Sequence, residues 1–213
     1  LDRFDAMISG RGASDQSFGH LMPLMGELTL EAVAYNCILA GCRPEELPVV
    51  LTAAEACTDD GFNLLGVLST TGTPTVAICV HGSLVTDLHM NAGSNALGPG
   101  NRANACIGRA VSLIMRNVAG AKPGVADMAT MGQPGKYTFC FAESAHPGFP
   151  SLPERRGFGA NESCMTVLGV SGTAEVLPIS GGESPEAVLQ PIAAAMNSSI
   201  DVSSLTRKPE RNE

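Results

Sequence analysis

The residues best suited to holding a small molecule lie in a segment rich in asparagine and glycine (residues 91–104, here called the asparagine loop). Its polar side chains are Asn91, Asn95, Asn101, Arg102 and Asn104. An asparagine amide offers hydrogen-bond donors and acceptors without charge, and an arginine can clamp a carboxylate or phosphate. A helix expected from about residue 102 would add free backbone donors at its N-terminus. We therefore predict that these five residues bind a small polar or anionic substrate. The alternative is a tight loop in which asparagine and glycine only form turns.

Proton transfer and nucleophilic attack are predicted from a second segment, residues 132–143. Lys136 and Tyr137 stand where a loop enters an expected strand, and Glu143 stands where that strand ends. Strand ends in open sheets border ligand crevices. We expect Lys136 or Glu143 to move a proton and Tyr137 to contact substrate. Cys140 is a less favoured candidate for a nucleophile. Packing is the alternative for Cys140, because alternation places it on the opposite face from Glu143. A surface ion pair is the alternative for Glu143.

A third set of candidates comes from the histidines. His146 lies in a loop rich in proline and glycine (residues 144–163), where we expect it to bind substrate, with an ordinary solvated loop as the alternative. His81 follows an expected buried strand and is a further ligand-facing candidate. No histidine pair has the spacing of metal ligands, and no cysteine pair has CxxC spacing, so no metal site is predicted. The asparagine loop matches neither a Walker loop nor a GxGxxG fingerprint, so no cofactor is predicted.

The elements that must position these residues follow from caps and periodicity. Thr29 and Gly41 should bound one helix, and Pro44 should open a second, which gives an N-terminal αα-hairpin. Further helices are expected over residues 102–118 and from Ser184 to about residue 196, besides a short one near the N-terminus. Strands are expected at residues 62–69, 75–80, 137–142 and 165–170. The predicted fold is α/β or α+β, with a small mixed sheet covered by helices.

Composition limits the function classes. The chain has 213 residues, 44% of them hydrophobic, which favours one domain over residues 1–202 and a polar tail over 203–213. The net charge of −8 disfavours nucleic acid. A central group of basic residues nevertheless suits a small anion; its members are Arg102, Arg109, Arg116, Lys122 and Lys136. No apolar run approaches the length of a membrane span. The odd number of cysteines, seven, indicates reduced thiols in a cytoplasmic protein.

Five strings of the sequence are long enough to compare with known families: Thr29–Val33, Ala40–Val50, Gly98–Asn104, Ile107–Ala110 and Gly132–Cys140. Together they resemble a bacterial family of uncharacterised proteins associated with a UGSC or CGSC thiol/selenol motif, and the resemblance covers most of residues 25–160. Neither motif occurs in this chain, and the nearest string is Glu162-Ser-Cys164. The resemblance therefore implies no selenol-type redox chemistry. It implies no particular activity and supports only the choice of segments.

Three hypotheses about function follow. The first is an enzyme that acts on a small polar or anionic metabolite by hydrolase- or lyase-type acid–base chemistry, since no cofactor fingerprint is present. The second is a non-catalytic subunit or binding module for a thiol-type partner protein, and the abundance of alanine and methionine favours packing between copies in a homo-oligomer. The third is thiol redox chemistry through Cys140 and Cys164.

Overall fold

The computed structural model describes residues 2–159, 162–177 and 184–196, which fall into two units, residues 1–172 and 173–213. In the second unit, α8 (Pro185–Met196) begins after Ser184, whose hydroxyl accepts a hydrogen bond from the Ala187 N–H at 3.3 Å. The helix therefore begins where the sequence predicts it, with Ser184 as its cap and Pro185 as its first residue. The expected tail over residues 203–213 lies outside the described residues.

The αα-hairpin predicted near the N-terminus is confirmed. It consists of α2 (Leu30–Ala40) and α3 (Leu47–Ala56), which follow α1 (Asp2–Ile8). The Thr29 hydroxyl accepts from the Ala32 N–H at 3.1 Å, and Gly41 ends α2 in the left-handed conformation at φ 84°. A 3-10 turn (Pro44–Glu46) then leads into α3.

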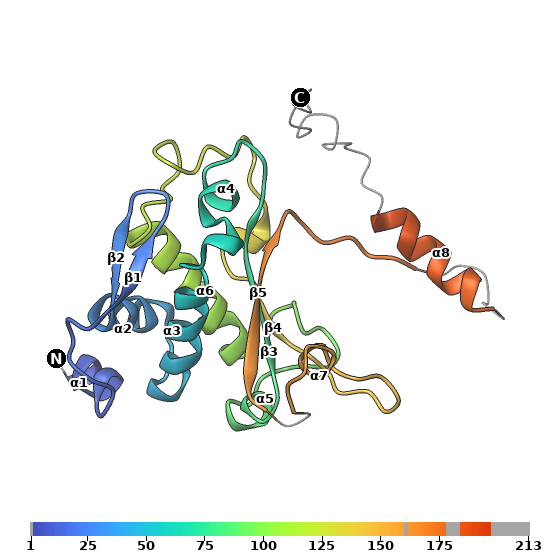
Figure 1. Cartoon of the computed structure of the whole chain (residues 1–213), viewed down its shortest axis with the longest axis horizontal. Coiled ribbons are helices and arrows are strands. Elements are labelled where there is room, and N and C mark those ends of the chain that lie inside the picture. The colour runs from blue at the N-terminus through green and yellow to red at the C-terminus, as the bar shows by residue number, and fades with distance from the viewer. Residues whose placement is uncertain (1, 160–161, 178–183, 197–213) are drawn as a thin grey trace, which may run out of the picture. The chain divides into compact units, whose positions relative to one another are not determined.

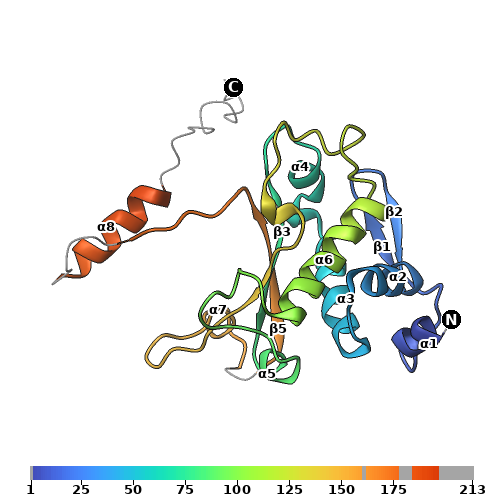
Figure 2. The ribbon, with the colours of Figure 1, turned by 180° about the vertical axis from the view of Figure 1, so that it is seen from behind.

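The main sheet has three strands in the order β4-β3-β5, where β3 is Thr75–His81, β4 is Cys140–Ala142 and β5 is Cys164–Val170. β3 pairs parallel with β4 and antiparallel with β5, so the fold is α+β with a mixed sheet, as predicted. All seven residues of β3 are buried. Figures 1 and 2 show α3 and α6 on one face of the sheet and the loop that carries α7 (Leu152–Arg155) on the other.

The longest helix, α6 (Arg102–Asn117), connects the asparagine loop to the rest of the molecule. Its apolar stripe includes Ile107, Val111 and Ile114, which are buried in the core. Gly108 is required where α6 meets the sheet, because a Cβ there would lie 2.7 Å from the backbone nitrogen of Phe139. This close approach fixes the helix against the residues that lead into β4.

Two sequence-based predictions of local structure are wrong. Residues 62–69 are not a strand: a 3-10 turn (Asp60–Phe62) leads into α4 (Leu64–Leu68). Asn63 sits between them at φ 53°, and its side chain caps α4 by accepting from the Gly66 N–H, so an apolar run forms a helix. The expected strand over residues 137–142 is shorter, because a 3-10 turn (Pro134–Lys136) precedes it.

Three small elements complete the first unit. An antiparallel hairpin, β1 (Ser17–Leu21) and β2 (Gly26–Thr29), lies between α1 and α2, where the sequence predicts no strand, and its turn contains a cis Met22–Pro23 peptide bond. The short helix α5 (Leu84–Asp87) follows β3. None of the helices in the described ranges is long and apolar enough to cross a bilayer.

Candidate functional site

The asparagine loop uses its amide groups to hold itself together. Asn101 caps α6, since its Oδ1 accepts from the Asn104 N–H at 2.9 Å and its Nδ2 donates to the carbonyl of His89 at 2.9 Å. The Asn104 side chain is buried and crosses the loop: Oδ1 accepts from the Asn91 N–H at 3.0 Å, and Nδ2 donates to the carbonyls of Asn91 and Ala96 at 2.9 and 3.2 Å. Asn104 is therefore fully engaged inside the protein.

The remaining two asparagines make turns. Asn91 donates to the carbonyl of Ser94 and accepts from the Gly93 N–H, both at 2.9 Å. Asn95 has a positive φ of 61°, and its Nδ2 donates to the carbonyl of Pro99 at 3.2 Å. These contacts support the alternative stated above, a tight loop built from asparagine and glycine.

Arg102 makes a bidentate ion pair with Glu46, which ends the 3-10 turn between the two helices of the αα-hairpin. Its Nη1 donates to Glu46 Oε2 at 3.0 Å, and its Nη2 contacts Oε1. Glu46 is only 1% exposed and also accepts from the Arg43 N–H at 2.9 Å, while Arg102 is 39% exposed. The carboxylate raises the pKa of the Arg102 guanidinium, mainly through this hydrogen bond. The charge of Arg102 is thus committed to a buried partner rather than to a ligand.

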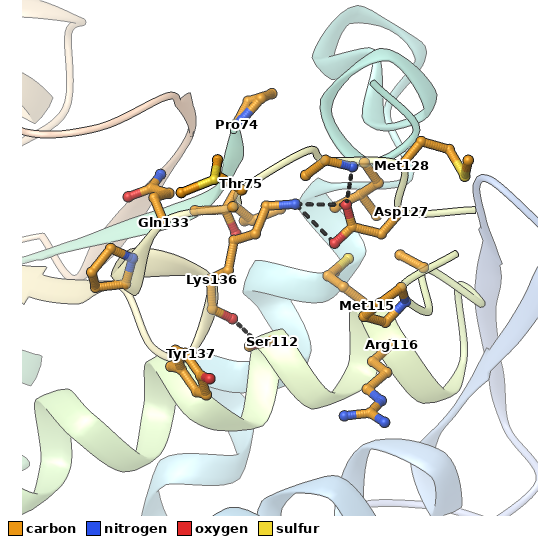
Figure 3. Close-up of a pocket in the computed structure, with 18 of the residues that line it drawn as sticks. Pro74, Thr75, Ser112, Met115, Arg116, Asp127, Met128, Gln133, Lys136 and Tyr137 are labelled. Atoms are coloured by element: carbon orange, nitrogen blue, oxygen red, sulfur yellow. Dashed lines mark hydrogen bonds and ion pairs between the residues drawn. The ribbon is translucent and has the colours of Figure 1, made fainter. Parts of the chain in front are cut away.

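A pocket lies elsewhere, beside α6 and the first residues of β3, and we call it the α6 pocket. Its volume is about 800 Å³. One wall is a face of α6 that carries Arg109, Ser112, Met115 and Arg116, and the facing wall is the segment 121–137. Figure 3 shows side chains from both walls around the cavity. None of the five predicted binding residues of the asparagine loop lines it.

An ion pair between Lys136 and Asp127 forms part of the pocket wall. Lys136 Nζ donates to both carboxylate oxygens at 2.8 Å, and Asp127 Oδ1 also accepts from the Ala129 N–H at 3.1 Å. The Ser112 hydroxyl donates to the Lys136 carbonyl at 2.5 Å, which ties this segment to α6. Lys136, predicted as a proton-transfer residue, therefore lies at the pocket with its ammonium paired.

Two arginines give the pocket a surplus of positive charge. Arg109 is half-buried and donates to the Tyr137 carbonyl at 3.4 Å, a long contact that leaves most of its donors free. Arg116 stands at the edge, where Figure 3 shows its guanidinium directed away from the Lys136–Asp127 pair. Tyr137, predicted to contact substrate, lines the rim and is exposed. Three cationic side chains thus line the pocket with one carboxylate, Asp127.

Known proteins give no guide to this pocket. Comparison of the chain with protein families, curated proteins and solved structures finds no match. The resemblance based on short strings stays a prediction. Within the described residues, no group of three or more His, Cys, Asp and Glu side chains is arranged to hold a metal ion.

Glu143 belongs to a different cluster, at the C-terminal end of β3. Its Oε2 lies 2.7 Å from Nδ1 of His81, whose Nε2 lies 3.0 Å from the hydroxyl of Thr166 on β5. The Leu152 N–H at the start of α7 donates to both oxygens of Glu143, at 3.0 and 3.2 Å. His81 is buried, and Glu143 and Thr166 are half-buried. We call Thr166, His81 and Glu143 the Thr166 relay.

The two cysteines of the redox hypothesis lie on opposite faces of the sheet. Cys140 is opposite Ile78 on the face that α6 covers and belongs to the hydrophobic core, whereas Cys164 is opposite His81. Burial raises the pKa of the Cys140 thiol, which keeps it protonated. Neither a Cys140–Cys164 disulfide nor a nucleophilic Cys140 fits this arrangement, and the packing alternative for Cys140 is the one supported.

His146 does not approach either cluster. It is exposed, its Nδ1 lies 2.9 Å from the Pro147 carbonyl, and its ring packs edge-on against Phe149 with centroids 5.5 Å apart. The alternative of an ordinary solvated loop accounts for these contacts.

The sequence contained a partial signal for the α6 pocket. Arg109 and Arg116 belong to the central basic group predicted to suit a small anion, and Ser112 lies between them on the same face of the helix. Asp127, Met128 and Met131 had no signal, because they lie in a segment without periodicity. Thr166 was likewise missed, since only strand pairing brings it to His81.

Proposed function

We propose that this chain binds a small anionic metabolite with an apolar body, and that the binding site is the α6 pocket rather than the asparagine loop. The observation that carries the proposal is the set of Arg109, Arg116 and Lys136 around one carboxylate, Asp127, in a cavity of about 800 Å³. Cavities of roughly 300–1,000 Å³ are typical of ligand sites.

The apolar part of the ligand is argued from the remaining wall residues. The side chains of Leu68, Val76 and Met115 form the floor, and Met128 and Met131 stand at the exposed rim. Methionine side chains adapt to ligands of different shape. A ligand with a carboxylate, sulfonate or phosphate at one end would meet Arg109, while its hydrocarbon part would cover these apolar side chains.

Acid–base catalysis in this pocket is less well supported than binding. The Lys136 ammonium donates hydrogen bonds to both oxygens of the Asp127 carboxylate, so it is already paired within the protein. A lysine that removes a proton must first lose its own. The hydrolase or lyase activity expected from sequence therefore has no ready base in the α6 pocket.

The cellular compartment and the assembly state of the protein are also part of the proposal. All seven cysteines are free thiols, which favours a reducing compartment such as the cytoplasm. A homo-oligomer or a partner subunit remains a prediction, which sedimentation of the purified chain would check: a monomer at all concentrations contradicts it.

The test uses two fluorescent probes that differ in one charge. Anilinonaphthalene sulfonate is an apolar anion, and phenylnaphthylamine has the same rings without the sulfonate. We expect the sulfonate to bind more tightly, and Arg109→Ala to weaken it about tenfold, the loss of one charge-assisted contact. Phenylnaphthylamine should bind the parent and Arg109→Ala equally. Octanoate should displace the sulfonate, and octanol should not.

Arg155→Ala is the matched control, because Arg155 is an exposed arginine of α7 that does not line the pocket. It should leave binding of both probes unchanged. Equal affinity of the sulfonate for the parent and for Arg109→Ala would contradict the proposal, as would equal losses in Arg109→Ala and Arg155→Ala.

A further inference from the structure

The Thr166 relay has the order of groups that activates a hydroxyl. A carboxylate, an imidazole and a hydroxyl are joined by contacts of 2.7 and 3.0 Å, and they come from three strand regions. Nucleophilic catalysis needs a nucleophile within hydrogen-bond reach of a base that a third group orients. We propose that Thr166 is an acyl-transfer nucleophile, with His81 as its base and Glu143 as the positioning residue. This proposal goes beyond anion binding and does not depend on it.

The hydrogen-bond inventory determines where the protons lie. The Glu143 carboxylate can only accept, so Nδ1 of His81 must donate to it. In the neutral imidazole, Nε2 then carries no hydrogen and accepts the hydroxyl hydrogen of Thr166. Two further hydrogen bonds, both from the Leu152 N–H, hold the carboxylate in place. The threonine proton is therefore already directed at the base.

The face of the sheet around Thr166 is partly exposed and largely apolar. Thr166 is opposite Cys79 in the β3–β5 pairing, and Phe141 is opposite Cys79 in β4, so the three side chains share one face of the sheet. Leu168, two residues further along that face, is 36% exposed. Burial, and secondarily the charge of Glu143, raise the pKa of the Cys79 thiol to about 12, so it stays neutral beside the relay. A small apolar acyl group suits this face.

The relay is also separate from the α6 pocket. The pocket borders Thr75 and Val76 at the start of β3, and His81 is the last residue of that strand. At about 3.3 Å per residue, the five steps from Val76 to His81 span roughly 17 Å.

The reaction that these groups support is the hydrolysis of an activated ester. Thr166 Oγ bonds to the ester carbonyl carbon while its proton passes to His81 Nε2. The bond from that carbon to the leaving oxygen then breaks, and the leaving alcohol takes the proton from His81. A water molecule then attacks the carbonyl carbon of the acyl-threonine and gives one proton to His81 Nε2. The bond from that carbon to Thr166 Oγ breaks, and Oγ takes the proton back from His81. The net change is ester plus water to acid plus alcohol.

The experiment treats the full chain with p-nitrophenyl acetate, follows release of p-nitrophenolate, and maps the acetyl group by peptide mass spectrometry after an acid quench. We expect acetyl on Thr166, and at least a tenfold lower rate of labelling of the 164–170 strand in Thr166→Ala. Thr166→Ser keeps the hydroxyl and should retain the acetylated residue even if Thr166→Ala folds poorly. Glu143→Gln should slow acetylation and remove the low-field proton resonance of His81 Nδ1–H.

Two controls separate the relay from ordinary surface reactivity. Ser163→Ala removes an exposed hydroxyl that bonds Ser83 Oγ at 2.9 Å, and Cys164→Ala removes the half-buried thiol beside His81 in the pairing. Both variants should still be acetylated at Thr166. Absence of an acetyl group on residue 166 in both the parent and Thr166→Ser, or acetyl found only on Cys164 and lysines, would overturn the proposal. Neither outcome bears on probe binding in the α6 pocket.

Discussion

The asparagine loop and the α6 pocket are both rich in polar side chains, but they use them in opposite ways. In the loop, the amides of Asn101 and Asn104 and the guanidinium of Arg102 bond to groups of the protein itself. In the pocket, Arg109 and Arg116 keep most of their hydrogen-bonding capacity. The comparison shows that residue type alone does not identify a binding site, because an uncommitted charge is what a ligand can use.

The largest effect that tests this comparison is expected from Arg102→Ala. It leaves the Glu46 carboxylate buried without its cation, and breaking a buried ion pair in this way costs about 3 kcal/mol or more of folding free energy. Urea unfolding followed by circular dichroism measures the loss. Binding of anilinonaphthalene sulfonate to the folded fraction should not change. A stable Arg102→Ala variant with weakened probe binding would reverse the roles assigned to the two regions.

Asn104→Ala should have the next largest effect. It removes a buried amide that makes three hydrogen bonds across the loop, and leaving such groups unpaired costs about 2 kcal/mol. The same unfolding measurement applies, with exposed Asn95→Ala as the control that should cost less than about 1 kcal/mol. Equal losses in the two variants would show that Asn104 does not hold the loop together.

Asp127→Asn sharpens the comparison from the side of the pocket. It removes the one carboxylate that pairs Lys136, while an amide oxygen can still accept from the Ala129 N–H. The freed charge should tighten binding of the sulfonate probe about fivefold, which corresponds to about 1 kcal/mol. Asp87→Asn, an exposed residue of α5, is the control for the change in net charge. Unchanged or weaker binding in Asp127→Asn would contradict a role for the ion pair in limiting anion affinity.

The smallest effect is expected from Arg116→Ala. Arg116 stands exposed at the edge of the pocket, so it should contribute only about twofold to affinity. Screening should remove that contribution at about 1 M salt, where the Debye length falls to about 3 Å. Titrations of the sulfonate probe at two salt concentrations measure it. A tenfold loss that persists in high salt would make Arg116, rather than Arg109, the principal anion contact.

The sequence predicted those parts of the fold that local chemistry determines. The helices α2, α6 and α8 follow from their caps and stripes, and β3 and β5 follow from apolar runs. The apolar run at residues 62–69 led to a wrong prediction of a strand, because the left-handed conformation of Asn63 starts a helix there. The hairpin β1–β2 has no clear hydrophobic pattern, because each of its strands has only one buried residue, Leu21 in β1 and Leu28 in β2.

The candidate sites were only partly predictable for a different reason. Lys136, Tyr137 and Glu143 were chosen from their places at the ends of a strand, and the structure puts the first two at a pocket and the third beside His81. Their partners Asp127 and Thr166 are set by long-range packing. Whether an asparagine is free or engaged likewise depends on carbonyls that the sequence does not locate.

The absence of a side chain at Gly108 has a bearing on how the pocket accommodates ligands of different size. Since α6 already lies at contact distance from the chain entering β4, the helical wall of the cavity has no space to retreat toward the sheet. Any adjustment must come from the opposite wall, where Gly124 and Gly132 have positive φ angles. A bulkier guest should thus slow amide hydrogen exchange over residues 121–137 and leave exchange along the helix unaltered.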